Sequence, residues 1–364
     1  MAAPRTRLIV IFGGRSAEHD VSRVTAAHVL AAADPARYEV VPVGVTREGQ
    51  WVLATDAARA LASGGALPRA LEAAGAPVDP LPALTGGDGS SPMPADPEQT
   101  VVVLPLMHGP LGEDGTVQGM LELADLPYVG SGVLSSALSM DKAVAKELLA
   151  HHGVPQCRWH ALRSDQITAA TPQELVDELG LPLFVKPANM GSSVGVTKAH
   201  DLDEVRAGVD AALGYDEWVI AEEAVVGREI EVAVLGGLDP RASVPGEIRP
   251  GREFYDYEDK YETDGAELLV PAPLDAGAAA EVQALAVRVF GLLRCDGMAR
   301  VDFFYEEGGR GFLLNEVNTI PGFTPISMYP KLWAASGVPY AELIDELVRL
   351  ALERHARHRR NTKH

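Results

Sequence analysis

The sequence predicts an α/β and α+β protein, in which an open parallel sheet with flanking helices comes first and a two-lobed mixed region follows. Across the first 139 residues, short apolar runs alternate with helical stretches, as such a sheet requires. From Asp141 onward the order is helix, strand and helix, and then a long β-rich stretch. The length of 364 residues also exceeds one ordinary core. We therefore expect an N-terminal domain at 1–139, a central lobe at 140–227 and a C-terminal lobe at 228–364.

The N-terminal domain begins with a strand that leads directly into a helix. Three apolar runs are the predicted strands of this domain: 8–12, 40–45 and 101–104. The first is followed by a predicted helix at 21–33, and we expect Asp20 and Ser22 to cap that helix. Because the first strand ends in Gly13-Gly14 at the helix N-terminus, backbone N–H groups are presented to a ligand at the carboxyl edge of the sheet.

Beyond these elements, one segment is irregular and two are helical. Residues 63–99 are rich in Ala, Gly, Pro and Ser, so we interpret them as an elaborated surface connection with some helix at 67–74. Apolar residues recur at helical spacing over 276–293 and 340–360. The second of these helices ends in four arginines: Arg354, Arg357, Arg359 and Arg360. Their charges complement the helix dipole, and we expect them to form a solvated, fraying tail.

The composition excludes several classes of protein. A formal net charge of −20 repels phosphates, so neither nucleic acid nor an anionic membrane is expected as the main partner. No apolar run approaches the roughly 18 residues that span a bilayer, and the run at 8–12 is too short for a signal peptide. Cys157 and Cys295 form neither a disulfide framework nor a zinc site. We expect a globular protein of the reducing cytoplasm.

A candidate phosphate-binding loop lies in the central lobe. Lys186 ends an apolar strand, and the Gly-Ser-Ser-Val-Gly segment at 191–195 follows it. The amides of such a loop can fold over phosphate oxygens while the lysine supplies a point charge. A plain hairpin turn between two strands would look similar, so this alternative stays open. The loop is not a Walker A motif, because the Gly-Lys-Ser/Thr ending is missing.

A candidate magnesium site lies on two strands of the C-terminal lobe. Asp302 belongs to the apolar strand at 298–304, and Glu316 and Asn318 belong to the strand at 312–318. A hairpin turn at 306–310 joins the two strands, and residues two apart on a strand share a face. If Asp302 lies on that face, three hard oxygen donors converge, as magnesium prefers. The alternative is a set of outward polar residues on a half-exposed hairpin.

Five ordered segments resemble the ATP-grasp ligases, and most closely the D-alanine:D-alanine ligase family. The resemblance covers almost the whole chain and is carried by 13–22, 108–119, 127–132, 139–142 and 318–330. It implies a two-lobed ATP-grasp fold that joins two D-alanines into D-alanyl-D-alanine through a D-alanyl phosphate, with ADP and phosphate as the other products. It also implies ATP with two Mg²⁺ (or Mn²⁺) ions, a cytoplasmic role in peptidoglycan precursor synthesis, and a homodimer formed through the N-terminal domain.

The resemblance assigns roles on the nucleotide side of the site. Charge that develops on a transferred phosphoryl group calls for metal ions and basic side chains. The implied phosphate and metal ligands are Lys142, Lys186, Lys260, Ser192, Ser193, Asp302, Glu316 and Asn318. Glu222 would face the adenine amino group, main-chain groups of Glu223 and Val225 would flank the base, and Glu229 would accept from the ribose. Some relatives carry lysine at the position of Glu223, and a solvated acidic pair of Glu222 and Glu223 is the alternative.

The resemblance also assigns the amino-acid side of the site. Glu18 would hold the ammonium of the first D-alanine, with Ser192 and Tyr261 as its partners, or would only decorate the first turn of the helix. Arg300 and the Gly322 amide would stabilise the tetrahedral intermediate. The remaining implied residues are Ser327 for the second carboxylate and His108 beside it, although His108 could equally be structural.

Residues 250–265 resemble the mobile loop of the family, and the resemblance implies that this loop covers the site, excludes water and affects specificity. Tyr261 lies in it, and relatives that make D-alanyl-D-lactate lack this tyrosine, so its presence favours the dipeptide. Three alternatives remain open: a ligase that uses D-lactate or D-serine second, a ligase or carboxylase for a larger acid, and a non-catalytic nucleotide-binding regulator.

Overall fold

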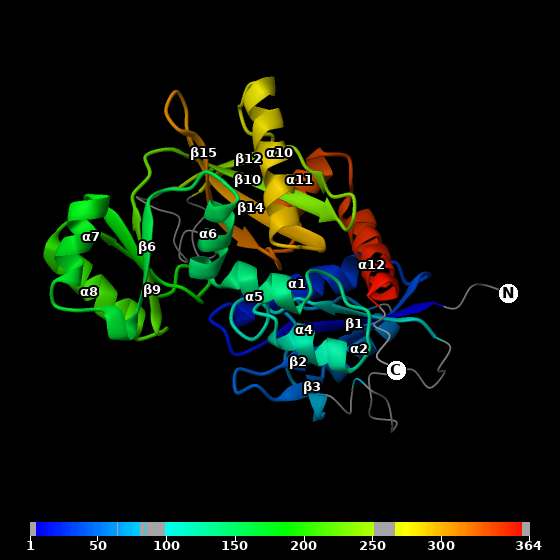
Figure 1. Ribbon diagram of the computed structural model, residues 1–364. Helices are drawn as coiled ribbons and strands as arrows, with labels where there is room; N and C mark the ends of the chain where they lie inside the picture. Colours follow the sequence, from blue (N-terminus) through cyan, green and yellow to red (C-terminus); the bar gives the residue numbers. More distant parts are fainter. Residues whose placement is uncertain (1–4, 64, 81–83, 85–98, 251–265, 359–364) are drawn as a thin grey trace, which may run out of the picture.

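The computed structural model describes residues 5–63, 65–80, 84, 99–250 and 266–358. Two predicted site residues, Lys260 and Tyr261, and the predicted loop around them lie outside the described residues, as do Arg359 and Arg360. Three sheets succeed one another along the chain, and each falls within one of the three segments expected from the sequence. Figure 1 shows the central segment standing to one side of the other two.

The first sheet has the order β4-β3-β2-β1-β5. Its elements are β1 (Thr6–Gly13), α1 (His19–Ala32), β2 (Tyr38–Val45), β3 (Trp51–Leu53), α2 (Thr55–Ala62), β4 (Ala76–Pro77), β5 (Val101–Pro105) and α4 (Thr116–Leu123). β1 pairs in parallel with β2 and β5, which confirms the predicted parallel sheet. β3 and β4 extend the sheet with antiparallel pairing that the sequence did not reveal. The predicted helix at 67–74 is wrong, since those residues have irregular backbone.

The junction of β1 and α1 differs from the expected cap. Glu18 occupies the N-cap position, and no side chain caps the helix. The Ser22 hydroxyl accepts from the Gly13 N–H at 2.7 Å and donates to the Leu106 carbonyl at 2.6 Å, so it links the ends of β1 and β5. Asp20 instead pairs with two arginines at the surface. Gly13 is required here because a Cβ would lie 2.2 Å from the Val45 carbonyl oxygen.

The central segment is a four-stranded antiparallel sheet of order β6-β9-β7-β8 with helices against it. Its elements, after the connecting α5 (Val133–Met140), are α6 (Lys142–His151), β6 (Trp159–Arg163), a 3-10 turn (Ser164–Gln166), α7 (Thr171–Leu179), β7 (Leu183–Pro187), β8 (Thr197–Ala199), α8 (Leu202–Leu213) and β9 (Trp218–Glu223). Apolar residues of α7, α8 and the sheet form a separate core.

The C-terminal segment is a six-stranded antiparallel sheet, with β13-β12-β10-β14-β15 in order and β11 paired to β10. Its elements are β10 (Arg228–Gly236), β11 (Arg241–Ala242), β12 (Gly246–Arg249), β13 (Glu267–Leu269), α10 (Ala276–Leu292), β14 (Gly297–Glu306), β15 (Gly311–Asn318), α11 (Met328–Ala335) and α12 (Tyr340–Arg357). The predicted hairpin and both predicted helices are confirmed.

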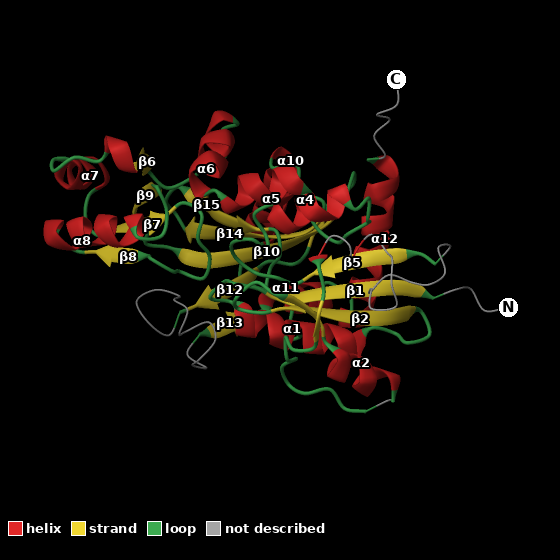
Figure 2. Ribbon diagram, turned by 90° about the horizontal axis from the view of Figure 1, so that it is seen from below, coloured by secondary structure: helices red, strands yellow, loops and turns green. Residues whose placement is uncertain are grey.

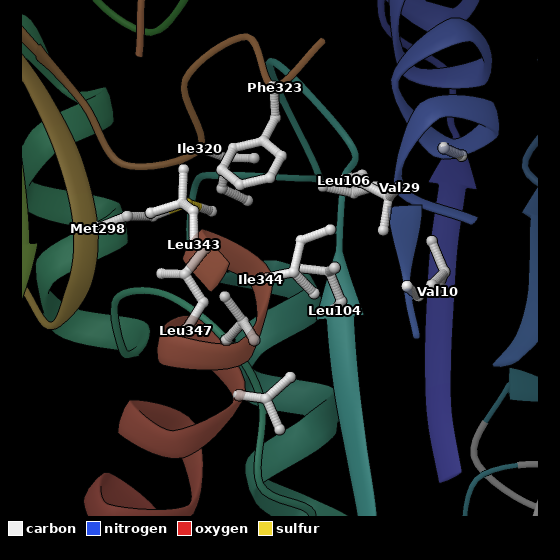
Figure 3. Packing of buried hydrophobic residues seen from close by; sticks show 14 of the residues in the cluster. Val10, Val29, Leu104, Leu106, Met298, Ile320, Phe323, Leu343, Ile344 and Leu347 are labelled. Carbon is white, nitrogen blue, oxygen red and sulfur yellow. The ribbon is translucent and has the colours of Figure 1, made fainter. Parts of the chain in front are cut away.

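One apolar core joins the first and last segments. α12 contacts strand β5 and helix α1 of the N-terminal segment as well as strand β14 of the C-terminal segment (Figure 2). The shared core contains Val10 and Leu104 from the N-terminal strands, Met298 from β14, and Leu343 and Leu347 from α12 (Figure 3). The N-terminal and C-terminal segments therefore pack against each other through buried apolar surface, which is the main favourable contribution to such an interface.

Candidate active site

A cavity of about 830 Å³ lies where the three segments meet. Nine of the residues predicted from the sequence line it: Glu18, His108, Lys142, Ser192, Arg300, Glu316, Asn318, Gly322 and Ser327. A concave site of this size that is lined by convergent polar groups is typical of a ligand pocket. The folded chain thus brings together residues that are up to about 300 positions apart in the sequence.

The predicted metal ligands lie on adjacent strands of one sheet. Asp302 on β14 is directly opposite Glu316 on β15, and Arg300 is opposite Asn318. Partners that face each other across an antiparallel pair project on the same side, so the four side chains share one face. The Asn318 amide donates to Asp302 Oδ2 at 2.9 Å, which places two of the three oxygen-bearing groups in contact. The donor set of two carboxylates and an amide fits Mg²⁺, which takes further ligands from water and phosphates.

Arg300 is held between two buried acids. Its guanidinium donates to both oxygens of Asp302, at 2.8 and 2.7 Å, and lies 3.0 Å from Glu231 Oε2. Glu231 is on β10, opposite Asp302, and it also lines the cavity. Sequence reasoning missed Glu231, although its place two residues after Glu229 on a strand puts both on one face. The fixed guanidinium is ready to stabilise negative charge in the cavity.

The phosphate side of the cavity is formed by α6 and the loop after β7. Lys142 at the start of α6 donates to the Met190 carbonyl at 2.7 Å and lies 3.8 Å from Glu316 Oε2. Ser192 and Ser193 both have left-handed backbone, with φ of 49° and 58°. Non-glycine residues in this conformation carry strain that clusters at ligand-binding sites. β7 and β8 do form a hairpin across this loop, and a hairpin is compatible with a ligand-binding loop.

Glu222 is the centre of a buried charge cluster beside that loop. Its carboxylate lies 2.7 Å from the Lys146 ammonium and 2.5 Å from that of Lys186, and it is 4% exposed. Burial alone would raise the pKa of Glu222, but the two ammonium groups outweigh it and lower that pKa to about 2. Lys146 was not predicted, although it stands four residues after Lys142 on the same helix face. A buried carboxylate with two lysines contradicts the solvated-pair alternative for Glu222.

The side chain of Glu223 contacts two arginines instead of the lysine cluster. Its carboxylate accepts from the Arg158 backbone and side chain, at 2.8 and 2.7 Å, and from Arg310 at 2.5 Å. These contacts occupy its side chain, which agrees with the expectation that only its main chain would reach a nucleotide. Val225 and Glu229 are both half-buried and lie outside the cavity wall, as Ser193 does.

Two carboxylates lie beside Gly191, the residue before Ser192 in the loop after β7. A Cβ placed on Gly191 would lie 3.2 Å from Glu18 Oε2 and 3.9 Å from Glu113 Oε1. Glu113 accepts from the Gly109 N–H at 2.8 Å. Burial and the neighbouring charge of Glu18 both raise the pKa of Glu113. Two acids in one wall suit a cationic group such as an ammonium. Glu113 was not predicted as a site residue, although it lies in the segment 108–119 that resembles the family.

His108 connects the N-terminal domain to the loop before α11. Its Nδ1 lies 2.9 Å from the Ile320 carbonyl, so in the neutral ring Nδ1 carries the proton and Nε2 keeps a lone pair. Nε2 is buried and has no hydrogen-bond partner. In the same loop, Ser327 shares a hydrogen bond of 2.8 Å with the Thr324 hydroxyl at the start of α11. His108 therefore holds the loop before α11 and also lines the cavity.

Comparison with known proteins places the chain in a family. Its residues 7–131 match the family model for the D-Ala D-Ala ligase N-terminus, and residues 148–349 match that for the D-Ala D-Ala ligase C-terminus. The chain belongs to the D-alanine–D-alanine ligase family. The resemblance that the five sequence segments indicated is confirmed, and with it the ATP-grasp fold.

Relatives match this member of the family over nearly their whole length. A D-alanine–D-alanine ligase of Kineococcus radiotolerans is 48% identical, over 96% of this chain and 98% of that protein. The structure of the D-alanine–D-alanine ligase from Coxiella burnetii aligns with a TM-score of 0.81 and 34% identity, covering 98% and 96% of the two chains. A D-Ala:D-Ser ligase from Enterococcus faecalis aligns equally well, with a TM-score of 0.81, 34% identity, and coverage of 95% and 99%. Among the described residues, no helix is long and apolar enough to cross a bilayer.

Proposed function

We propose that this protein uses ATP to join two D-alanine molecules into D-alanyl-D-alanine for peptidoglycan synthesis. The observation that carries the proposal is the presence of both acidic and basic side chains in one cavity. Glu18 and Glu113, acids that suit an ammonium, lie beside Gly191, and Lys142 and Ser192 of the phosphate side line the same cavity. A zwitterionic amino acid whose ammonium is held by these acids presents its carboxylate toward the nucleotide phosphates.

The chemistry has two steps. An oxygen of the first D-alanine carboxylate attacks the γ-phosphorus of ATP, ADP leaves, and an acyl phosphate forms. The amine of the second D-alanine then attacks the acyl carbon, phosphate leaves, and the ammonium proton is lost. Arg300 and the Gly322 N–H stabilise the charge of the tetrahedral intermediate, and Ser327 orients the second carboxylate. The D-alanyl phosphate route follows from the need for a better leaving group than a carboxylate oxygen.

Other groups support the nucleotide. Lys186 and Lys142 contact its phosphates, and Glu222 faces its adenine. Asp302, Glu316 and Asn318 would hold the two Mg²⁺ (or Mn²⁺) ions, which would supply positive charge to the phosphates when bound. We also propose that Lys260 and Tyr261 cover the reacting groups, and that the protein is a cytoplasmic homodimer. We propose the domain boundaries at residues 139 and 227.

The identity of the second substrate needs a direct test, because one similar structure is a D-Ala:D-Ser ligase. The purified protein should be incubated with ATP, Mg²⁺ and D-alanine, alone or with an excess of D-serine or D-lactate, and the products weighed by mass spectrometry. We expect D-alanyl-D-alanine as the main product in every mixture, with one phosphate released for each peptide. A mixed product as the main species would replace the dipeptide assignment with the D-serine or D-lactate alternative. Failure to consume ATP in all mixtures would rule out the ligase.

A further inference from the structure

Two cations, Lys331 and Arg69, line the cavity without a role in the chemistry above. Lys331 lies on α11 and Arg69 on the irregular segment between α2 and β4, and both contribute to the cavity wall. Among the described residues, neither side chain has a carboxylate within ion-pair distance. Asp20, the acid that also lines this part of the wall, is occupied by Arg23 at 2.8 Å and Arg47 at 2.6 Å.

Lys331 stands one helical turn after Ser327. Its backbone N–H donates to the Ser327 carbonyl at 3.2 Å, and residues four apart lie on the same face of a helix. Lys331 is half-buried, so part of its hydration is removed without a compensating acid. A half-buried ammonium in a polar cavity is best satisfied by an anion that enters the cavity.

The charge of the whole chain makes such a cation necessary. At a formal net charge of −20, the long-range field repels a carboxylate-bearing substrate. The acids Glu18, Glu231 and Glu316 add negative charge to the cavity wall itself. Lys142 and Arg300 also line the wall, but Lys142 belongs to the phosphate side and Arg300 is paired with Asp302 and Glu231. A local positive charge therefore favours the acceptor carboxylate, and Lys331 is the cation on α11, the helix whose N-cap is Ser327.

We propose that Lys331 determines acceptor binding by pairing with the carboxylate of the second D-alanine at Ser327, with Arg69 adding positive charge at the cavity wall. This inference rests on the proposed function. Lys331 contributes to binding of the acceptor and not to the transfer of the phosphoryl group. Its charge is what matters, so arginine should replace it and an uncharged chain of similar length should not.

The test compares Lys331→Met, Lys331→Arg and the matched control Lys198→Met, which removes a lysine from β8 in the central lobe. Dipeptide formation is measured against D-alanine concentration at saturating ATP and at several salt concentrations. For Lys331→Met we expect a rise of roughly three- to tenfold in the KM for the acceptor, as for a partly exposed ion pair, with kcat and the KM for ATP within about twofold of wild type. Its salt dependence should be weaker than that of the wild type.

Lys331→Arg and Lys198→Met should behave as the wild type does. An unchanged acceptor KM in Lys331→Met overturns the proposal. An equal rise in the acceptor KM of Lys331→Arg also overturns it, because the effect would then come from the shape of the side chain and not from its charge. An equal rise in Lys198→Met overturns it as well, because the effect would then come from the net charge of the protein. Thermal unfolding of each variant separates these results from misfolding. A wild-type protein that makes no dipeptide would instead contradict the proposed function, before any variant is compared.

Discussion

At the scale of single residues, Arg300 is the side chain whose loss should affect chemistry most. We expect Arg300→Ala to lower dipeptide formation by about 10²- to 10³-fold, as does loss of one donor to a transition-state anion. ATP binding should be partly retained, because Lys142 and Lys186 are on the central segment. Mass detection of the dipeptide and calorimetric titration with ATP measure the two effects.

Arg300 also separates Asp302 from Glu231, so a second variant is needed. Arg300→Lys keeps a positive charge between the acids but loses the planar fork that contacts both oxygens of Asp302. It should fold as the wild type does and still lose most activity. Near-native turnover in Arg300→Ala would show that the tetrahedral intermediate is stabilised by another group.

Glu222 is the residue whose loss should affect stability most in the central segment. Glu222→Gln leaves Lys146 and Lys186 buried without their counter-charge, at a cost of about 3–5 kcal/mol in the free energy of unfolding. Because the pKa of Glu222 is depressed, its contribution is present above the ordinary value of 4.5 and is lost as the pH falls toward 2. The difference from wild type should therefore be full at pH 7 and shrink over that acidic range.

Urea unfolding at a series of pH values measures this difference. Glu217→Gln, which changes an exposed glutamate of the same segment, is the control and should cost little at any pH. If Glu222→Gln were no less stable at pH 7 than Glu217→Gln, the two lysines would not depend on this carboxylate.

These residues also show what can be predicted from a sequence. Glu316 and Asn318 were predictable as neighbours because residues two apart on a strand share a face. The place of Asp302 was not, because a register shift between Asp302 and Phe303 sets Asp302 opposite Glu316, whereas unbroken pairing from the turn would set it opposite Asn315. Lys146 and Glu231 were not, because their importance depends on partners from other elements: Glu222 on β9 for the lysine and Arg300 on β14 for the glutamate. Only tertiary contacts distinguish such a buried charge from a solvated one.

At the scale of elements, the connection from β1 to α1 depends on one hydroxyl. The predicted strand and helix are both present, but Ser22 bonds to Gly13 and Leu106 instead of capping the helix. A cap can be predicted from local spacing, whereas a bond to β5 requires the sheet. In the same way, β3 and β4 are three and two residues long, which is too short for a periodic pattern.

Removal of that hydroxyl should loosen the first sheet. Ser22→Ala leaves the buried Gly13 N–H and Leu106 carbonyl without their partner, so we expect it to lower the free energy of unfolding by about 1–3 kcal/mol. Hydrogen exchange at Gly13 should become faster than in wild type. Ser63→Ala, at an exposed serine of the same domain, is the control for urea unfolding and should have almost no effect. Equal stability of the two variants would contradict the link between β1 and β5.

At the scale of the whole molecule, the C-terminal helix binds the first and last segments together. The prediction of a solvated tail is wrong for Arg354, which is 4% exposed, and Arg357 pairs with Asp296 at 2.6 Å. The amphipathic spacing of α12 was visible in the sequence, and its existence was predicted correctly. The surface against which α12 packs was not predicted, because arginines at the end of a helix have the same spacing in the sequence whether they face water or a second domain.

Arg354 is the contact on which this attachment can be tested. Its guanidinium lies 4.0 Å from the centre of the Tyr128 ring, donates to the Gly130 carbonyl at 3.0 Å, and pairs with Glu122 at 3.1 Å. Arg354→Met keeps much of the apolar chain but removes the cation and the buried hydrogen bond, so we expect a loss of about 2 kcal/mol in the free energy of unfolding. The matched control is Arg349→Met on the same helix, where the side chain is half exposed and, among the described residues, pairs within α12, with Glu346 and Glu353. That change should cost less than about 1 kcal/mol. Urea unfolding of both variants decides the matter: an equal cost would mean that α12 is held by its apolar face alone and that the arginine adds nothing to the joining of the two segments.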